Sequence, residues 1–328
     1  LRPKNFQEVV GQELVTNALK HSISKKNFHH AYLFTGGRGV GKTTIARLIA
    51  KAINCQKITS GEPCKKCNYC RDIDLGKFID VLEIDAASNR GVEEIQQILE
   101  QVQFLPALGT KKIMIIDEVH MLSNHAFNAM LKTLEEPPDH IMFILATTEP
   151  QKIPQTVISR CLKFTLGNIS PKLIEKYLEN TFKELSIPFE QSAINSISKA
   201  AQGSLRDALS ISDQAISCGE GSITKKIVDE MLGFVPNKLI DELVEAISNN
   251  DPNEALKLTT TITKSGVPAD LILERLSIFF HDLSVKKATG VDSENFDFIN
   301  TNSNNLTINL SECNIFYQII VLGRRDLT

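Results

Sequence analysis

The sequence contains no apolar run long enough to cross a membrane. Its longest runs, such as IMFILA at residues 141–146, fall far short of the ~18 residues that a spanning helix needs. It also lacks, at its start, the charged and then apolar stretch of a secretory signal. These absences argue against a membrane protein or a secreted one, and we expect a soluble, cytoplasmic chain with no membrane partner.

The sequence has no excess of positive charge either. Its 36 Lys and Arg against 39 Asp and Glu give a net charge of −3, with a pI near 6.2. A protein held to DNA mainly by its own basic surface would be more positive, so any contact with nucleic acid should be local or shared with other subunits. The 328 residues, 42% of them hydrophobic, predict a globular protein of two or three domains. Because the chain begins at Leu1 and not at Met, we expect it to be a trimmed part of a longer protein.

Strand patterns alternate with helical patterns in the first half of the chain. The segment 31–54, AYLFTGGRGVGKTTIARLIAKAIN, is typical of a strand, a glycine-rich turn and a helix. Further buried strands are predicted at 81–86, 112–117 and 141–148, and helices at 92–103 and 123–135. Such alternation indicates a parallel α/β sheet.

After residue 167 the strand pattern disappears and helical periodicity takes over. Helices are predicted at 171–185, 191–201, 204–218, 224–232, 237–249, 252–265, 268–288 and 313–325. The polar, Asn-rich stretch 289–312 predicts a loop. The organisation is therefore an α/β domain at 1–167, a small helical domain at 168–233 and a second helical domain at 234–328.

A phosphate-binding loop lies between the first strand and the first long helix. Residues 36–43, GGRGVGKT, match the pattern G-x-x-x-x-G-K-[ST]. Its glycines let backbone amides wrap phosphates, and the helix that follows adds a positive dipole end. Lys42 would neutralise phosphate oxygens, and Thr43 would offer its hydroxyl to Mg²⁺. A coincidental glycine-rich turn is a weak alternative, because the required strand and helix flank the pattern.

Two carboxylates end a later buried strand. Apolar residues 113–116 bring Asp117 and Glu118 to its C-terminal end, where parallel sheets bind ligands. Asp117 would hold Mg²⁺ through water, and Glu118 would orient the attacking water. Two acidic residues at the start of a solvated helix are the alternative, which is weak beside a phosphate loop. Together the motifs predict ATP hydrolysis with Mg²⁺, and we assign no role to His120, which we expect to be a surface residue at a helix start.

Four of the seven cysteines fall within residues 55–70, CQKITSGEPCKKCNYC. The odd total and the missing signal argue against a disulfide framework. Four thiolates from Cys55, Cys64, Cys67 and Cys70 suit tetrahedral Zn²⁺ with no open position, which predicts a structural site that braces a small insert. A redox dithiol would leave two cysteines unexplained, and the Cys-Pro that completes a common iron–sulfur pattern is missing. Unligated thiols here would be an oxidation liability.

Three further residues have two interpretations each. Arg160, after the last core strand, could enter a neighbour's active site as an arginine finger, but the residues alone favour a surface salt bridge. Arg206 lies in the first turn of a helix that Ser204 and Asp207 would cap, and a cation there hints at a nearby anion. One hydroxyl of the pair Thr147-Thr148 could sense a γ-phosphate, although a β-branched residue is ordinary at a strand end.

The motifs together resemble the AAA+ clamp loaders, and most closely the gamma/tau subunits of bacterial DNA polymerase III. The likeness rests on FQEVVGQE, HHAYLFTGGRGVGKT, the four-cysteine insert, EIDAASN, DEVHMLSNHAFNAMLKTLEEPP, LATTEPQKIP, SRC, GSLRDALS and IIVLGRRDL. It spans nearly the whole chain and is weakest from 236 to 312. The resemblance implies a P-loop AAA+ ATPase domain with a zinc insert, a helical lid domain and an all-α collar domain that joins subunits into a ring.

The resemblance also implies an activity. The family couples ATP binding to opening a sliding clamp and placing it on primed DNA, within a polymerase III holoenzyme whose polymerase active site is on another chain. The implied partners are delta, delta-prime and further gamma/tau copies in a hetero-pentamer, with the clamp and primed DNA. Arg90 and its neighbours are candidate DNA contacts. One alternative is a DNA-translocating motor of the ring-helicase type, which the cysteine insert and SRC disfavour. The other is a silent scaffold, which the intact ATPase motifs disfavour.

Residue roles follow from the same resemblance. Arg160 falls on the trans-acting finger, Thr148 on the first sensor and Arg206 on the second, while Val9-Val10-Gly11 matches the segment that contacts adenine. The implied catalytic residues are Lys42, Asp117, Glu118, Thr148, Arg160 and Arg206. The implied nucleotide-binding residues are Val10, Gly36, Gly37, Arg38, Gly39, Val40, Gly41, Lys42, Thr43 and Thr44, and the implied zinc ligands are the four clustered cysteines.

Overall fold

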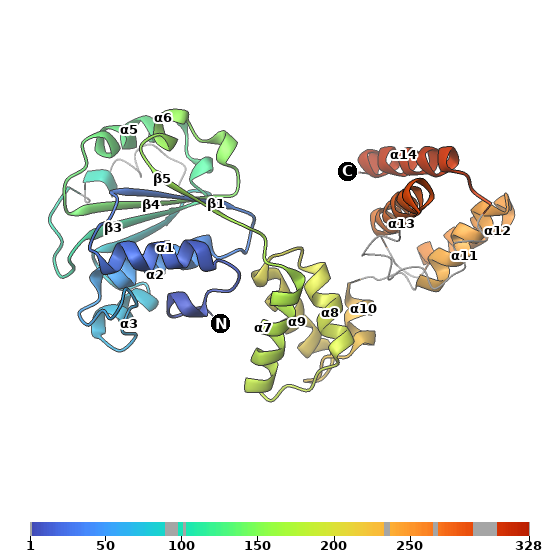
Figure 1. The fold of residues 1–328 in the computed structure, drawn as a ribbon, viewed down its shortest axis with the longest axis horizontal. Coiled ribbons are helices and arrows are strands. Elements are labelled where there is room, and N and C mark those ends of the chain that lie inside the picture. The colour runs from blue at the N-terminus through green and yellow to red at the C-terminus, as the bar shows by residue number, and fades with distance from the viewer. Residues whose placement is uncertain are drawn as a thin grey trace. The chain divides into compact units, whose positions relative to one another are not determined.

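The computed structural model describes residues 2–88, 98–100, 103–232, 237–264, 268–290 and 307–327. The chain divides into two compact units, Leu1–Ser217 and Cys218–Thr328 (Figure 1). Arg90, most of the predicted helix 92–103 and most of the Asn-rich stretch 289–312 lie outside the described residues. The predicted boundaries of the three domains stay a prediction.

A five-stranded parallel sheet forms the centre of the first unit, in the order β2-β3-β4-β1-β5. The strands are β1 (Ala31–Gly36), β2 (Val81–Asp85), β3 (Lys112–Asp117), β4 (Ile141–Thr147) and β5 (Leu162–Leu166). The first four confirm the predicted strands, and the parallel α/β class is confirmed with them. The edge strand β5 was not predicted, because LKFTL is mostly solvent-exposed and only Phe164 and Leu166 turn inward. Phe164 stacks on Phe34 of β1, with ring centroids 5.7 Å apart.

Helices cover both faces of this sheet (Figure 1). Helices α1 (Glu13–Ser24) and α2 (Lys42–Asn54) cover one face, and α5 (Asn124–Glu135) and α6 (Gln155–Ile158) cover the other. Alternate side chains of each strand therefore enter different cores: Ile113 and Ile115 of β3 pack on the α2 side, and Met114 and Ile116 on the α5 side. Every residue of β4 is buried, as expected for a central parallel strand.

The remaining elements are short or helical. In the first unit they are η1 (Phe6–Glu8), α3 (Asn68–Asp74), η2 (Val119–Met121), η3 (Pro150–Lys152), α7 (Pro171–Glu184), α8 (Gln191–Ala200) and α9 (Leu205–Cys218). In the second unit they are α10 (Lys225–Met231), α11 (Asn237–Ser248), α12 (Pro252–Lys264), α13 (Ala269–Thr289) and α14 (Leu310–Leu327). Each predicted helix from residue 171 onward is present, with ends within three residues of the prediction.

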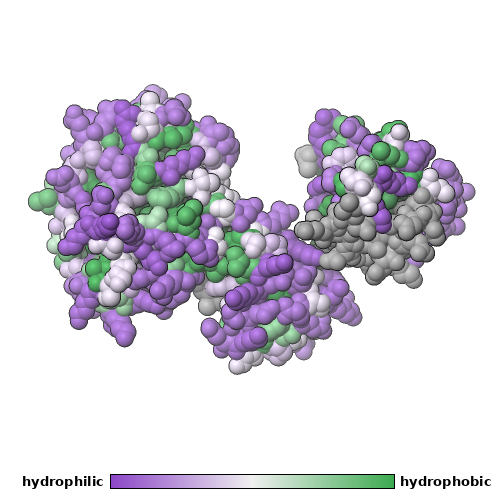
Figure 2. Space-filling model, in the orientation of Figure 1, coloured by the Kyte–Doolittle hydropathy of each residue, from purple (hydrophilic) through white to green (hydrophobic). Residues whose placement is uncertain are grey.

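The second unit has its own small apolar core. Helices α11 to α14 contribute to it, and Phe280 of α13 packs against Phe316 of α14 with ring centroids 5.2 Å apart. Hydrophilic residues cover most of the visible face of the first unit, and hydrophobic ones are confined to small groups (Figure 2). Among the described residues, no helix combines the length and the apolar character that crossing a membrane requires.

Candidate active site and metal centre

The phosphate loop links β1 to α2 at the carboxyl edge of the sheet. Gly36 and Gly39 have positive φ values of 149° and 71°. A Cβ atom at Gly36 would lie 2.5 Å from the Leu166 carbonyl oxygen, and one at Gly39 would lie 1.9 Å from Ser204 Oγ. Because only glycine tolerates these approaches, the loop can lie against both β5 and the start of α9. Gly41, with φ of 105°, precedes α2 and leaves the first amides of that helix facing the loop.

Lys42 is the first residue of α2 and is only 6% exposed. Its Nζ donates hydrogen bonds to the carbonyl oxygens of Gly36 at 3.0 Å and Gly37 at 2.7 Å. Burial lowers the pKa of Lys42, although the carboxylates of Glu118 and Asp117 act in the opposite direction. The loop therefore encloses an ammonium group at its centre, as a phosphate site requires.

Thr43, Asp117 and Glu118 form one chain of contacts. Thr43 Oγ1 donates to Asp117 Oδ2 at 2.6 Å, and the Glu118 backbone N–H donates to Asp117 Oδ1 at 3.0 Å. Glu118 is in the left-handed region, with φ of 46°, so the backbone turns sharply at the end of β3. Its Oε2 accepts from both the N–H and the hydroxyl of Thr148, at 3.2 and 3.0 Å. The two predicted Mg²⁺ ligands are thus adjacent, and Thr148 holds the carboxylate beside them.

His120 is not the surface residue that we expected. Its side chain is 6% exposed and lies among polar groups from two strand ends. Nδ1 is 3.0 Å from Thr147 Oγ1 and 3.4 Å from Glu118 Oε2, and Nε2 is 3.2 Å from Glu149 Oε1. The 3₁₀ turn η2 directs the ring back toward β4 instead of toward solvent. His120 therefore connects the Glu118 turn to the segment that follows β4.

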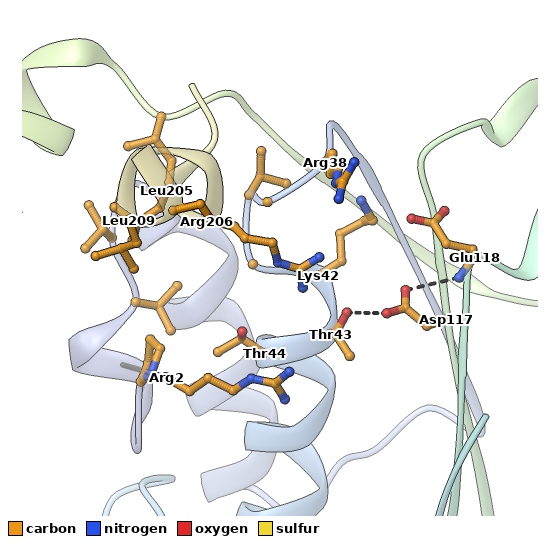
Figure 3. A pocket seen from close by; sticks show the side chains of 18 of the residues that line it. Arg2, Arg38, Lys42, Thr43, Thr44, Asp117, Glu118, Leu205, Arg206 and Leu209 are labelled. Atoms are coloured by element: carbon orange, nitrogen blue, oxygen red, sulfur yellow. Dashed lines mark hydrogen bonds between the residues drawn. The ribbon is translucent and has the colours of Figure 1, made fainter. Parts of the chain in front are cut away.

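Arg206 approaches the loop from α9. The Asp207 N–H donates to Ser204 Oγ at 3.2 Å, so Ser204 caps this helix as predicted. Arg206 lines the same cavity as Lys42, together with Leu205 and Leu209 one turn apart. In Figure 3 the Arg206 side chain extends toward α2 and the phosphate loop. A cation at a helix N-terminus is unfavourable alone, so its place beside the loop favours an anionic ligand.

The cavity has a mixed wall of cations, carboxylates and apolar groups. It is lined by Arg2, Pro3, Val9, Val10, Arg38, Gly39, Val40, Gly41, Lys42, Thr43, Thr44, Asp117, Glu118, Ile169, Leu205, Arg206, Leu209, Ser210 and Asp213. The lining residues that were not predicted from the sequence are Arg2, Pro3, Ile169, Leu205, Leu209, Ser210 and Asp213. Leu205 and Leu209 lie within GSLRDALS at helical spacing and could have been found, whereas no local pattern singles out Arg2. Four of the predicted catalytic and nucleotide-binding residues are not among the lining residues: Gly36, Gly37, Thr148 and Arg160.

Arg160 lies outside its own chain's cavity. Its Nη1 donates to the Thr156 carbonyl oxygen at 2.6 Å, and its Nη2 donates to Glu135 Oε1 at 2.6 Å. The surface salt bridge that the residues alone favoured is therefore present, with the Arg160 side chain 33% exposed. A guanidinium has five N–H donors, so two bonds hold this group without using all of them.

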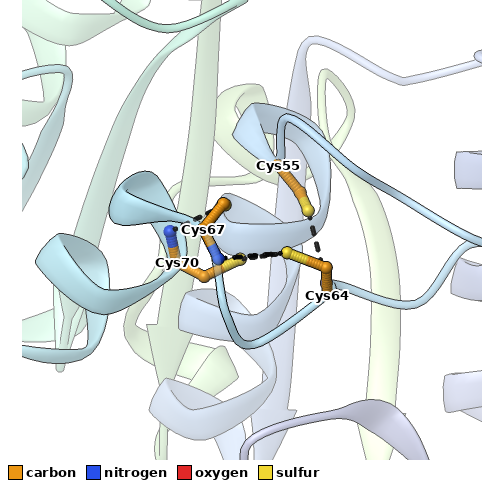
Figure 4. Close-up of side chains that lie close together, drawn as sticks. All are labelled: Cys55, Cys64, Cys67 and Cys70. Carbon is orange, nitrogen blue, oxygen red and sulfur yellow. Dashed lines mark hydrogen bonds between the residues drawn. The ribbon is translucent and has the colours of Figure 1, made fainter.

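The four clustered cysteines converge at the start of α3 (Figure 4). Their Sγ atoms all lie within 4.8 Å of one another, with Cys64 and Cys70 at 4.0 Å. Tetrahedral Zn–S bonds of about 2.3 Å place sulfurs about 3.8 Å apart, so the donor set fits such an ion. Burial alone would raise the pKa of the Cys64 thiol, but backbone N–H groups of Cys67 and Lys66 lower it to about 6. Burial instead raises the pKa of the Cys55 and Cys70 thiols. Of these three thiols, Cys64 therefore most readily forms the thiolate, the form in which cysteine binds metals.

Three family models match consecutive parts of the chain. The model described as "DNA polymerase III, delta subunit" matches residues 11–170, and the model for the "DNA polymerase III clamp loader subunit, ATPase lid domain" matches 173–221. The model for "DNA polymerase III subunits gamma and tau domain III" matches 223–328.

Curated relatives match most or nearly all of the chain. DNA polymerase III subunit tau of Escherichia coli is 43% identical over 99% of this chain and 51% of its own length. Subunit gamma of Buchnera aphidicola from Acyrthosiphon pisum is 39% identical over 99% of this chain and 91% of its own. Subunit tau of Bacillus subtilis is 44% identical over 89% of this chain and 52% of its own. The chain spans about half the length of the tau relatives it matches.

Solved structures show the fold. The RuvB Holliday junction branch migration motor of Thermotoga maritima superposes with a TM-score of 0.52 at 20% identity, over 82% of this chain and 86% of that one. At this identity the similarity shows the fold alone.

Proposed function

Because the chain belongs to the DNA polymerase III gamma and tau subunit family, we propose that it is the ATP-hydrolysing motor of a clamp loader. It would act in the cytoplasm, within a polymerase III assembly, and load a sliding clamp onto primed DNA. The observation that carries the proposal is the meeting of the phosphate loop with Asp117 and Glu118 in one cavity. Phosphate-binding amides, a buried ammonium and paired carboxylates are the groups that Mg²⁺-dependent phosphoryl transfer uses.

Different residues of this chain would bind the phosphates, hold Mg²⁺ and orient the attacking water. The loop amides and Lys42 would bind the phosphate oxygens, with Thr43 and Asp117 as the groups that hold Mg²⁺. When bound, Mg²⁺ neutralises charge on the transferring phosphate. Glu118 would accept a hydrogen bond from the attacking water and aim it in line. Thr148 supports this role, because its two donors fix the Glu118 carboxylate at 3.0 and 3.2 Å.

Two arginines would add positive charge from different directions. Arg206, in the wall of the cavity, would bind the nucleotide phosphates of its own chain. Arg160 lies outside that wall, so we assign it to the site of a neighbouring subunit, as a finger that stabilises the transferring phosphate. This arrangement requires a ring, and the proposed neighbours are delta, delta-prime and further gamma/tau copies in a hetero-pentamer.

The cysteine cluster would hold a structural Zn²⁺ ion. Four sulfurs within bonding reach of one centre leave no position for a substrate. The insert therefore contributes folding energy and no chemistry. DNA would be bound by several subunits together, which suits a chain whose own net charge is −3.

ATP turnover by the purified chain, alone and with the other loader subunits, the clamp and primed DNA, tests this function. We expect strong stimulation only with the full set. Lys42→Ala should abolish turnover without unfolding the chain, and Arg160→Ala should leave ATP binding near normal but reduce turnover in the complex. A finger is worth about 10³-fold or more in the best cases.

Three results would contradict the assignment. Normal turnover by Lys42→Ala would remove the ATP site from this cavity. Full turnover by Arg160→Ala in the complex would leave Arg160 as a surface salt bridge only. Equal stimulation by duplex DNA without the clamp would indicate a translocating motor of the ring-helicase type.

A further inference from the structure

The N-terminal strap, defined here as residues 2–10, lines the nucleotide cavity at both of its ends. Arg2 and Pro3 line the cavity at one end, and Val9 and Val10 at the other. The five residues between them, 4–8, are not among the lining residues. These five residues connect the two ends, so the contacts that hold them contribute to where the ends lie.

The Phe6 side chain is buried in the core of the sheet domain, and two polar contacts tie the middle of the strap to the cysteine insert, residues 55–70. The Phe6 backbone N–H donates to Glu62 Oε2 at 3.0 Å. Glu8, two residues after Phe6, pairs through its Oε1 with Lys65 Nζ at 2.9 Å. Both partners lie between Cys55 and Cys70, more than fifty residues from the strap in sequence. The strap's internal contacts, such as Asn5 Oδ1 accepting from the Glu8 N–H, close a local turn and do not attach it to the domain.

A buried lysine makes a third attachment. Lys51 of α2 is 1% exposed, and its Nζ donates to the Lys4 carbonyl oxygen at 3.1 Å. The same ammonium binds both oxygens of Asp74, at 2.7 and 2.9 Å. Asp74 is the last residue of α3, the helix that starts inside the cysteine insert. Lys51 therefore connects the phosphate-loop helix, the insert and the strap at one point.

Glu62 is fixed by the same turn that brings the cysteines together. Its backbone pairs with Thr59 in both directions, at 2.9 and 3.2 Å, and the Cys64 N–H donates to Cys55 Sγ at 3.3 Å. The preceding residue, Gly61, lies so close to α1 that a Cβ there would be 2.4 Å from the Lys20 carbonyl oxygen. The turn from Cys55 to Cys64 therefore positions the Glu62 carboxylate toward Phe6, and the same carboxylate pairs with Lys20 Nζ of α1 at 3.5 Å.

We propose that the cysteine insert positions the N-terminal strap for nucleotide binding, with Glu62 as the positioning residue. This inference rests on the proposed nucleotide site. Closure of the insert holds Phe6 and Glu8, and these hold the two ends of the strap against the cavity. Ordering a loose strap during binding costs entropy, so a strap that is already held binds nucleotide more tightly. Turnover by bound nucleotide depends on Asp117 and Glu118, which do not contact the insert, and should change little.

Binding of a fluorescent ATP analogue with Mg²⁺ to the whole chain tests the proposal. Glu62→Ala removes the acceptor for Phe6 and should weaken binding about tenfold. Glu62→Gln keeps an oxygen at the same reach and should bind within about twofold of the unchanged protein. Lys65→Ala breaks only an exposed ion pair and should weaken binding by about twofold at most. The adjacent Lys66 is also exposed, so Lys66→Ala is the matched control and should leave analogue binding unchanged.

Removal of the proposed Zn²⁺ by a chelator, which is dialysed away before Mg²⁺ and the analogue are added, gives an independent readout. Chelation should weaken analogue binding by the unchanged protein toward the level of Glu62→Ala, and should weaken Glu62→Ala itself little further. Circular dichroism must show that the domain stays folded in each state, and hydrogen exchange at residues 4–8 should rise in parallel with the loss of binding.

The outcomes separate this inference from the proposed function. Failure of the unchanged protein to bind the analogue would refute both. Tight binding by the unchanged protein together with equally tight binding by Glu62→Ala would refute the positioning role alone. A Glu62→Gln variant as weak as Glu62→Ala would also overturn it, because the loss would then not follow the acceptor oxygen.

Discussion

Asp80 provides a sharp test of how the chain before β3 is held. Asp80 is only 1% exposed and lies directly before β2. Oδ1 accepts from the Ala107 N–H at 2.8 Å, and Oδ2 accepts from the N–H groups of Leu108 and Gly109 at 2.7 Å each. One buried carboxylate thus fixes three consecutive amides of the segment that leads into β3.

Asp80→Asn should destabilise the first unit by about 2 kcal/mol. Asparagine offers one side-chain oxygen, so at least one of the three hydrogen bonds is lost, and the remaining bonds are made to a neutral acceptor. A hydrogen bond to a charged group contributes about 1.5–3 kcal/mol. The loss is reduced because the released amides can bind water. For a unit of this size the change corresponds to a fall in Tm of about 5 °C. Thermal unfolding of the whole chain, followed together with hydrogen exchange at residues 107–109, measures it.

The same carboxylate makes the difference depend on pH. Burial would raise the pKa of Asp80, but the N–H groups of Gly109, Ala107 and Leu108 outweigh it and lower the pKa. A lowered folded-state pKa gives stability that is present above the unfolded value, about 3.9, and is lost as pH falls through the folded value. The gap between Asp80→Asn and the unchanged protein should therefore be full at pH 7 and close in acid. Unchanged exchange at residues 107–109 in the variant, or a gap that persists at low pH, would refute this reasoning.

Two further predictions concern the active site and the metal. His120→Ala should lower turnover in the assembled complex by about tenfold without changing ATP affinity, because Glu118 loses a neighbour that holds its carboxylate. His125→Ala, at an exposed position of α5, is the control. An equal effect of the two substitutions would exclude this role of His120. Cys64→Ser should abolish retention of one Zn²⁺ ion per chain in metal analysis and lower the Tm, whereas Cys218→Ser at an exposed position should do neither.

Much of the sheet and the site could be predicted from local patterns. Buried parallel strands are continuous apolar runs, so β1, β3 and β4 are visible in the sequence, whereas the edge strand β5 alternates with exposed residues and escapes notice. The phosphate loop is equally local, because its glycines, lysine and following helix are contiguous. The cysteine spacing predicted that four thiols converge on one point, and the four Sγ atoms do lie within 4.8 Å of one another.

Contacts between distant segments could not be predicted in this way. Nothing near His120 indicates that η2 turns its ring toward Thr147 and Glu149. Nothing near Phe6 indicates that Glu62, 56 residues later, accepts its N–H. Such pairs depend on how whole elements pack, and packing is decided by the total fit of apolar surfaces.

The sequence by itself therefore determined the chemical groups that the chain carries: a phosphate loop, a carboxylate pair after a buried strand and a cluster of four cysteines, each encoded within a short stretch. Only the tertiary structure decided which of these groups work together. It brought Thr148 to Glu118, kept Arg160 out of its own cavity and attached the cysteine insert to the strap beside the proposed nucleotide site. The physical reason is that local sequence sets backbone conformation and side-chain type, whereas proximity across the fold is fixed by burial of the sheet between two helical layers.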